Sequence, residues 1–459
     1  MNTTALTQGP IRRQLIALAL PMLAGNIMQQ LYNTVDAVLV GRIVGESAFA
    51  ALGVAGAVMN LFLFLISGGC SGVGVLLSQL YGAEDGPAFR RDFFLAALFG
   101  LLLSLGLTGA GLLLLDPLLS LLQTPESVCL YAHPYLTVIF LGFPAAFSYQ
   151  LSAAVLWAVG NTQAALLFLM VSMAVNLGLD LALIPYLDVA GAAWATVVSQ
   201  ALATGLCLGY LARRFPQLMF HRGDMRYDGP LLRRTAHYSF VSALHMASLY
   251  IGKLAVQRTV NGLGEASIAA YTAATRIEGF ANSFGDSGAS AMAVFIGQNT
   301  GAGDRERVFQ GLRQGRRLLA WFGVAVSLGM ILAASPLLSL VLPGQGGDSL
   351  DAAAGYLRLV ACFYLFNFLG SALAGFFEGL GRVNLTVIGA AGHITFRAVV
   401  SWLLAPALGL PAVALATGLG WVGVVTFWSV LARAWSRSGN ANHSHRCTVP
   451  SGETGRIPS

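Results

Sequence analysis

The sequence predicts an all-α polytopic membrane protein with twelve transmembrane helices in two pseudo-symmetric six-helix lobes. Of its 459 residues, 56% are hydrophobic and only 10% are charged, against about 25% charged residues in soluble domains. The mean hydropathy is +0.70. Apolar runs long enough to cross a hydrocarbon layer of about 30 Å recur along the chain. A water-soluble globule is therefore excluded.

The first lobe is predicted over residues 14–211, after a short N-terminal segment at 1–13. The first span carries an aspartate and is followed by further spans, which favours a permanent helix over a cleavable signal peptide. Charged residues, glycine and proline bound each apolar stretch. The predicted spans are 14–40, 48–80, 93–115, 131–159, 164–187 and 190–211.

A polar segment at 212–235 separates the first lobe from the second lobe, which is predicted over 236–435. The spans of the second lobe are 236–260, 266–299, 318–342, 354–380, 384–404 and 410–434. Beyond them, residues 436–459 are rich in polar residues, glycine and proline, which predicts a disordered tail.

The arginines predict the orientation of the chain. Alternate loops put twenty arginines on the side of the N-terminus and only Arg42 and Arg358 opposite. Cytoplasmic loops are the ones enriched in Lys and Arg, so both termini and the linker are expected in the cytoplasm. The basic residues stand at helix ends and in loops, so the net charge of +6 does not indicate nucleic-acid binding.

The two halves of the sequence resemble each other. Residues 45–85 align without gaps on 264–304, a shift of 219, with twelve identities in 41 positions, and both segments end in the pattern QxxGAxD. A shift of 221 then aligns Gly160 with Gly381, Pro185 with Pro406 and Thr196 with Thr417. Duplicated six-helix units in the same orientation are typical of rocker-type transporters.

Signatures of enzymes and metal sites are missing from the sequence. It contains no HExxH, GxSxG or P-loop pattern, and its five cysteines form no CxxC. His443 and His445 are too few for a metal site. We therefore expect neither an enzyme nor a cofactor, and cysteine is interpreted as a small packing residue.

Two aspartates inside predicted spans are the strongest candidates for function, because an ionised carboxylate at the centre of a bilayer costs about 2.5 kcal/mol or more. Asp36 in span 1 has Asn33 one turn before it, and Asp180 in span 5 has Asn176 at i−4. Two carboxyl groups in one poorly hydrated site favour a shared proton, or they coordinate a cation through their oxygens. The alternative is that either aspartate snorkels or caps a kink.

Other charged residues in the second half receive weaker assignments. Glu278 and Arg397 are secondary candidates, and their mutual neutralisation in a structural role is as good an explanation as function. Glu378 precedes GLGR near a helix end, which predicts a solvated or capping carboxylate. Asp286 stands among small residues typical of close helix packing. Lys253, the only lysine, is expected to line the cavity or to pair within it.

These residues and motifs resemble the multidrug and toxic compound extrusion (MATE) family over essentially the whole of 12–435. The resemblance is carried by PMLAGNIMQQLYNTVDAVLVGRIVG, QLYGAED, NLGLDLALIP, GAAWAT, GQNTGAGD and GLGRVN in this order. It implies two six-helix lobes around a central cavity, and export of organic cations or amphipathic drugs in exchange for H⁺ or Na⁺. The family's N-lobe cation site maps onto Asp36, Asn176, Asp180 and Thr196.

The resemblance also bears on the coupling ion. One branch of the family uses acids in spans 7 and 10 for sodium, whereas the matching stretches here carry His245 and Asn367. The chain is closer to the DinF-like branch, which favours H⁺, although an oxygen cage at Asp36 and Asp180 could also hold Na⁺. No resident metal is expected.

The alternative function is a flippase for polysaccharides or lipid-linked precursors, which shares the architecture. Such a protein should carry a basic cavity for phosphate groups, and few cations stand inside the spans here. The expected surroundings are the lipid bilayer of the bacterial inner (plasma) membrane, and the expected ligands are drug-like small molecules. No nucleic acid is expected as a partner, and the chain is expected to act as a monomer.

Overall fold

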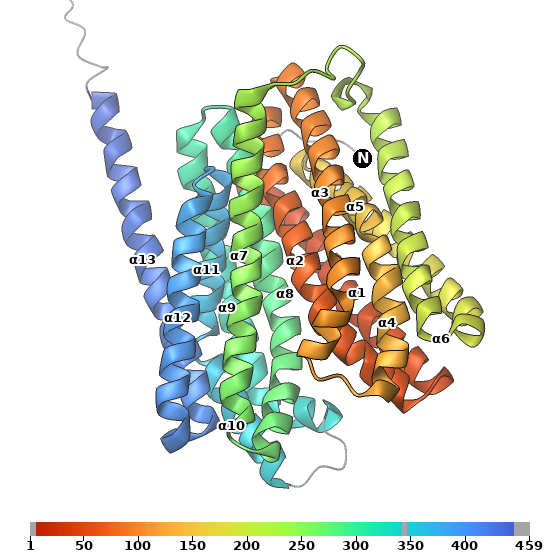
Figure 1. The fold of residues 1–459 in the computed structure, drawn as a ribbon. Coiled ribbons are helices and arrows are strands. Elements are labelled where there is room, and N and C mark those ends of the chain that lie inside the picture. Colours follow the sequence, from red (N-terminus) through yellow and green to blue (C-terminus); the bar gives the residue numbers. More distant parts are fainter. Residues whose placement is uncertain (1–5, 342–346, 445–459) are drawn as a thin grey trace, which may run out of the picture.

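The computed structural model describes residues 6–341 and 347–444 and is helical throughout, with no strand among these residues (Figure 1). Its helices are α1 (Ile11–Ile43), α2 (Glu46–Gly82), α3 (Gly86–Leu121), α4 (Glu126–Leu141), α5 (Phe143–Ala158), α6 (Thr162–Arg214), the short 3-10 helix η1 (Pro216–Leu218), α7 (Gly229–Asn261), α8 (Glu265–Gly301), α9 (Arg305–Val341), α10 (Gly347–Ala361), α11 (Tyr364–Gly379), α12 (Val383–Leu408) and α13 (Leu410–Ser444).

These helices account for the predicted spans in order. Eight described helices are long and apolar enough to cross a membrane, and there are ten such segments when each of two bent pairs is taken as one span. The pairs are α4 with α5, bent by 49°, and α10 with α11, bent by 50°. Dividing α6 at its break and adding α8 completes twelve segments. Spans 4 and 10, each predicted as one apolar stretch, are therefore broken helices.

The break in α6 lies at Asp188, which has φ 51° and ψ −137° inside an otherwise helical run. This left-handed conformation is unfavourable for a residue with a Cβ and turns the chain back between spans 5 and 6. Gly409, 221 positions later, has φ 63° between α12 and α13. The repeat seen in the sequence thus places corresponding breaks in both halves.

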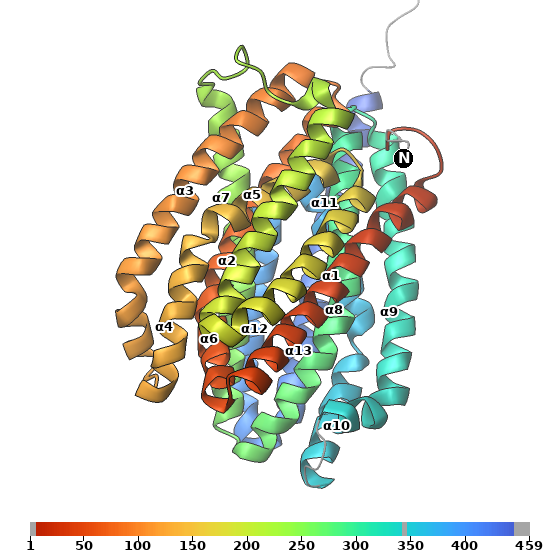
Figure 2. The same ribbon diagram turned by 90° about the vertical axis from the view of Figure 1, so that its right-hand side faces the viewer.

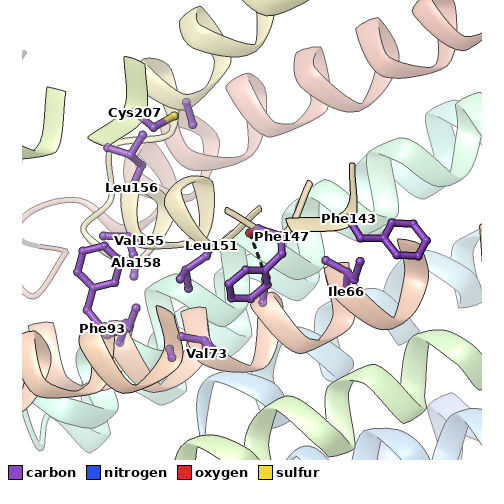
Figure 3. Packing of buried hydrophobic residues seen from close by; sticks show 14 of the residues in the cluster. Ile66, Val73, Phe93, Phe143, Phe147, Leu151, Val155, Leu156, Ala158 and Cys207 are labelled. Atoms are coloured by element: carbon purple, nitrogen blue, oxygen red, sulfur yellow. Dashed lines mark hydrogen bonds between the residues drawn. The ribbon is translucent and has the colours of Figure 1, made fainter. Parts of the chain in front are cut away.

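Buried apolar side chains form several clusters, one of which joins α1 of the first half to α8, α9, α11 and α13 of the second. The largest lies mainly among α2, α3, α4 and α5, and Figure 3 shows Phe147, Leu151 and Val155 among its members, together with Val73. A second cluster, which includes Tyr356, lies wholly within α7–α13. Cys70 and Cys207 are buried, as expected of packing residues.

The halves meet along α1, α2, α7, α8 and α9 (Figure 2). At Gly68 and Gly72, a Cβ would lie 2.7 Å from Ala243 Cα and 2.3 Å from the Tyr238 carbonyl oxygen of α7. Only glycine allows two backbones to approach this closely. The Gly- and Ser-rich stretch of span 2 is therefore a packing surface.

Figure 1 places the linker between η1 and α7, and the C-terminal end of α13, at the same end of the bundle. The linker is fixed to the start of α3. Arg90 Nε lies 2.9 Å from Asp224 Oδ2, and Arg91 Nη1 lies 3.0 Å from Asp228 Oδ2. The hydrogen bond from Arg90 lowers the pKa of Asp224, and the hydrogen bond from the Leu231 backbone N–H, followed by that from Arg91, lowers the pKa of Asp228. The linker is thus attached to the first half.

Two predicted boundaries need correction. The non-helical linker is shorter than 212–235, because α6 continues to Arg214 and α7 begins at Gly229. The predicted tail is helical at first, since α13 continues to Ser444, and residues 445–459 lie outside the described residues. Helices of 33–37 residues exceed the roughly 20 residues that cross the hydrocarbon, so they extend beyond the membrane where hydropathy no longer marks them.

Candidate functional site

The structure brings Asp36 of α1 and Asp180 of α6 together. Their side chains interact directly with each other. Asp180 is fully buried, and Asn176, one turn before it on α6, is 1% exposed. The packing of α1 on α6 therefore joins the carboxyl groups that the sequence separates by more than a hundred positions.

Thr196, beyond the break in α6, closes this site. Its hydroxyl donates to the Ala192 carbonyl oxygen at 3.0 Å and lies 3.0 Å from the Tyr32 hydroxyl. Asn176 Nδ2 lies 3.5 Å from Thr196 Oγ1. The break at Asp188 returns the chain antiparallel to itself, so that residues on the two parts of α6 face each other. All four predicted primary residues thus form one cluster.

Oxygen atoms without donors distinguish this cluster from an ordinary polar core. Apart from the direct interaction between the two carboxyl groups, Asp36 Oδ1, both carboxyl oxygens of Asp180, and Asn176 Oδ1 are buried without a hydrogen-bond donor from any described residue. An unsatisfied buried oxygen is costly, and two adjacent carboxylates repel each other. A proton or a small cation relieves both costs, so the arrangement suits reversible loading of a positive charge.

Sequence reasoning missed Tyr32 and chose Asn33 instead. Tyr32 lies one helical turn before Asp36, next to both Asp36 and Thr196. Asn33 is exposed, and its Oδ1 accepts a hydrogen bond from Gln29 Nε2 at 3.3 Å. Both i−3 and i−4 neighbours lie near Asp36 on a helix, so spacing alone could not choose between them.

Comparison with known proteins gives the family. The MatE family model matches residues 21–181 and 242–403, which together make up more than half of the chain. The chain belongs to the MatE family. The resemblance inferred from the sequence is confirmed, and the two matched segments begin 221 residues apart, which is the shift of the internal repeat.

Individual relatives agree with the family. The chain is 28% identical over 313 residues to the probable multidrug resistance protein YpnP of Bacillus subtilis, covering 67% of this chain and 69% of that protein. It is 26% identical over 369 residues to the FAD transporter of Shewanella oneidensis, covering 78% and 80%. A solved outward-facing multidrug resistance MATE family transporter shares the fold, with a TM-score of 0.89, 20% identity and coverage of 95% and 98%.

In this MatE protein, the secondary candidates Glu278 and Arg397 both lie among tyrosines of the second half. Glu278 of α8 is 7% exposed. Arg397 Nη2 of α12 donates to the Tyr271 hydroxyl at 3.1 Å. The two charged groups influence each other electrostatically, but no ion pair within 4.0 Å joins them in the described part of the chain. Any mutual neutralisation of Glu278 and Arg397 therefore acts across a distance longer than that of an ion pair.

Glu378 stands at the end of α11, as predicted, but it is not the solvated carboxylate that was one of the two alternatives. Its carboxylate is not solvated: Glu378 Oε1 lies 3.5 Å from His245 Nδ1, and the two side chains are 15% and 11% exposed. Glu378 was assigned to a helix end because GLGR follows it. In the folded protein, the His245 side chain of α7 lies next to the Glu378 carboxylate.

The repeated QxxGAxD motif seals the end of the bundle that holds the linker. Gln79 Nε2 of α2 donates to the Gly379 carbonyl oxygen in the second half at 2.9 Å. Gln298 Nε2 of α8 donates to the Ala158 carbonyl oxygen in the first half at 2.7 Å. Gln298 is the repeat counterpart of Gln79, and Gly379 is that of Ala158, so the two bonds form one reciprocal pair across the halves.

Glycine makes this seal possible. A Cβ at Gly82 would lie 1.9 Å from the Gln298 carbonyl oxygen, and a Cβ at Gly301 would lie 1.9 Å from the Gln79 carbonyl oxygen. Leu6, before α1, completes the seal, because its backbone N–H donates to Gln298 Oε1 at 3.2 Å. The conformation is therefore closed at the linker end.

Proposed function

We propose that this protein is a secondary active antiporter that exports organic cations or amphipathic drugs in exchange for H⁺, with Na⁺ as the alternative coupling ion. Family membership and relatives named as multidrug resistance proteins support multidrug efflux transport. The antiport proposal rests on the cluster of buried oxygens on Asp36, Asp180 and Asn176 that lack a hydrogen-bond donor among the described residues. Its two carboxyl groups are ionisable and stand inside predicted membrane spans, as expected of an exchangeable coupling site.

Alternating access connects the coupling site to the two sides of the membrane. The reciprocal glutamine bonds join the two halves next to the linker and Leu6. With the linker end in the cytoplasm, this conformation is closed on the cytoplasmic side. Loading Asp36 and Asp180 from outside and opening the glutamine seal are then two steps of one exchange cycle.

Dye efflux from everted membrane vesicles tests the proposal. Vesicles containing the protein should take up a cationic dye when an H⁺ gradient is imposed, and a protonophore should abolish the uptake. A Na⁺ gradient imposed alone distinguishes the two coupling ions. If a folded, correctly inserted protein moves no dye under either gradient but translocates a lipid-linked saccharide, the flippase replaces the exporter.

We further propose that the protein is a multi-pass protein of the inner membrane with both termini in the cytoplasm. The asymmetric arginines support this orientation, and the linker and the end of α13 lie at the same end of the bundle. A cysteine at Gly223, where a Cβ would touch nothing within 4 Å, should react with a membrane-impermeant maleimide only in everted vesicles. If this cysteine were labelled in intact cells, the linker would lie outside the cell and the proposed orientation would be wrong.

A further inference from the structure

The second half contains the repeat counterpart of the acid site, and its charge is inverted. The shift of 221 places Arg397 at the position of Asn176 and Ser401 at that of Asp180. The shift of 219 places Ala255 at the position of Asp36. In the second half, uncharged residues therefore stand at the positions of both aspartates, and an arginine stands at the position of Asn176.

The structure confirms that the two places correspond. Thr417, the counterpart of Thr196, donates to the carbonyl oxygen four residues earlier at 2.7 Å, as Thr196 does at 3.0 Å. In the first half, the Tyr135 hydroxyl lies 3.9 Å from Met59 Sδ. Their counterparts, Tyr356 and Glu278, also neighbour each other.

The guanidinium of Arg397 is not neutralised by direct contact. Its Nη2 donates to the neutral Tyr271 hydroxyl, and its Nε has no acceptor among the described residues. Glu278 is the acid that acts on it, from beyond ion-pair distance. A charge held inside a protein without a close counter-ion is costly, so a bound anion would stabilise this site.

Hydroxyl donors surround the guanidinium. Tyr356, Tyr364 and Ser401 are fully buried. The Tyr364 and Ser401 hydroxyls make no hydrogen bond with any described residue, whereas the Tyr356 hydroxyl interacts with Glu278. Both tyrosines interact electrostatically with Arg397, and Ser401 lies one turn beyond it on α12. Together with Arg397 Nε, these groups come from α10, α11 and α12, and Glu278 Oε1 is a buried acceptor without a hydrogen-bond partner among the described residues.

Aromatic rings also lie around the Arg397 site. Tyr271 and Tyr356 stand edge to face with centroids 5.5 Å apart, and Tyr364 stands edge to face with Trp421 at 5.2 Å. Such rings pack well against another aromatic ring. We propose that the second half contains an anion-binding pocket centred on Arg397 that takes an aromatic carboxylate.

Glu278 then acts as the built-in competitor of the ligand. Its carboxylate repels an incoming anion, and it partly balances the positive charge of Arg397 when no anion is bound. A cargo that carries an aromatic carboxylate in addition to a cationic group would engage both halves of the protein. Only this role in cargo recognition rests on the proposed export function, whereas anion binding does not.

Binding of benzoate to the purified full-length protein in nanodiscs tests the pocket, with neutral benzamide as the matched ligand. Arg397→Gln should weaken benzoate binding about tenfold or more, because a charge-assisted contact is lost. Glu278→Gln should strengthen it about threefold, because the competing charge is removed. Arg276→Gln, which removes an exposed arginine from α8, should leave it unchanged. Benzamide should bind weakly to all four proteins.

The opposite effects of the two substitutions separate a pocket from a structural cluster. If Glu278 and Arg397 only stabilised the fold, both changes would weaken benzoate binding or neither would alter it, and either result overturns the proposal. Absence of saturable benzoate binding to the wild type also overturns it, while leaving dye efflux untouched. Absence of dye efflux with benzoate binding intact contradicts the proposed export function alone.

Discussion

Asp36→Asn is expected to reduce gradient-driven dye efflux by about tenfold or more while the protein still folds and reaches the membrane. Asparagine keeps the size and hydrogen bonding of the aspartate, but it binds no exchangeable proton and offers no negative charge to a cation. Asp36 Oδ1 has no donor in the described structure, so no hydrogen bond is lost at that atom. Removing a poorly compensated buried charge is neutral or mildly stabilising.

The measurement compares efflux in everted vesicles with dye binding to the purified protein. Asp36→Asn and Asp180→Asn should both bind dye, and neither should release it in response to the gradient. Asp116→Asn is the matched control, because the Asp116 side chain is 82% exposed. Efflux at the wild-type rate in either site variant would remove these residues from the coupling site.

Gly82→Ala is expected to abolish efflux for a different reason, by preventing closure of the linker end. The added Cβ would lie 1.9 Å from the Gln298 carbonyl oxygen, which belongs to the backbone and cannot rotate away. The two halves would have to separate at this end, breaking the bonds of Gln79 and Gln298. We expect an efflux rate lowered by about tenfold or more, with the coupling residues intact.

A cysteine in place of Leu6 reports on this closure, in a background whose native cysteines are replaced by serine. Leu6 is 4% exposed at the seal, so the reporter should be protected when the end is closed and reactive in Gly82→Ala. Gly53→Ala on the same helix is the matched control, because its Cβ would meet nothing within 4 Å. A protected reporter together with normal efflux in Gly82→Ala would show that the seal has no part in transport.

Much of the cluster around Asp36 and Asp180 was predictable because each of these acids stands inside a long apolar run. A carboxylate inside a long apolar run is costly in any membrane fold, so Asp36 and Asp180 were visible without knowing their partners. Tyr32 was not, since a tyrosine in a span is ordinary. Its role depends on the rotation of α1 about its axis, which brings the i−4 neighbour of Asp36 rather than Asn33 against Thr196.

The sequence by itself determined the number and order of the membrane segments, the duplication and the identity of the charged residues. These depend on the length of apolar runs, on residue type and on a repeat, all of which are properties of the chain. Only the tertiary structure decided which groups meet. The contact of Asp36 with Asp180, the pairing of Glu378 with His245 and the reciprocal bonds of Gln79 and Gln298 each join residues far apart in sequence. Hydropathy locates a helix along the chain, but how helices cross and rotate is set by the packing of side chains and close-approaching glycines against their neighbours.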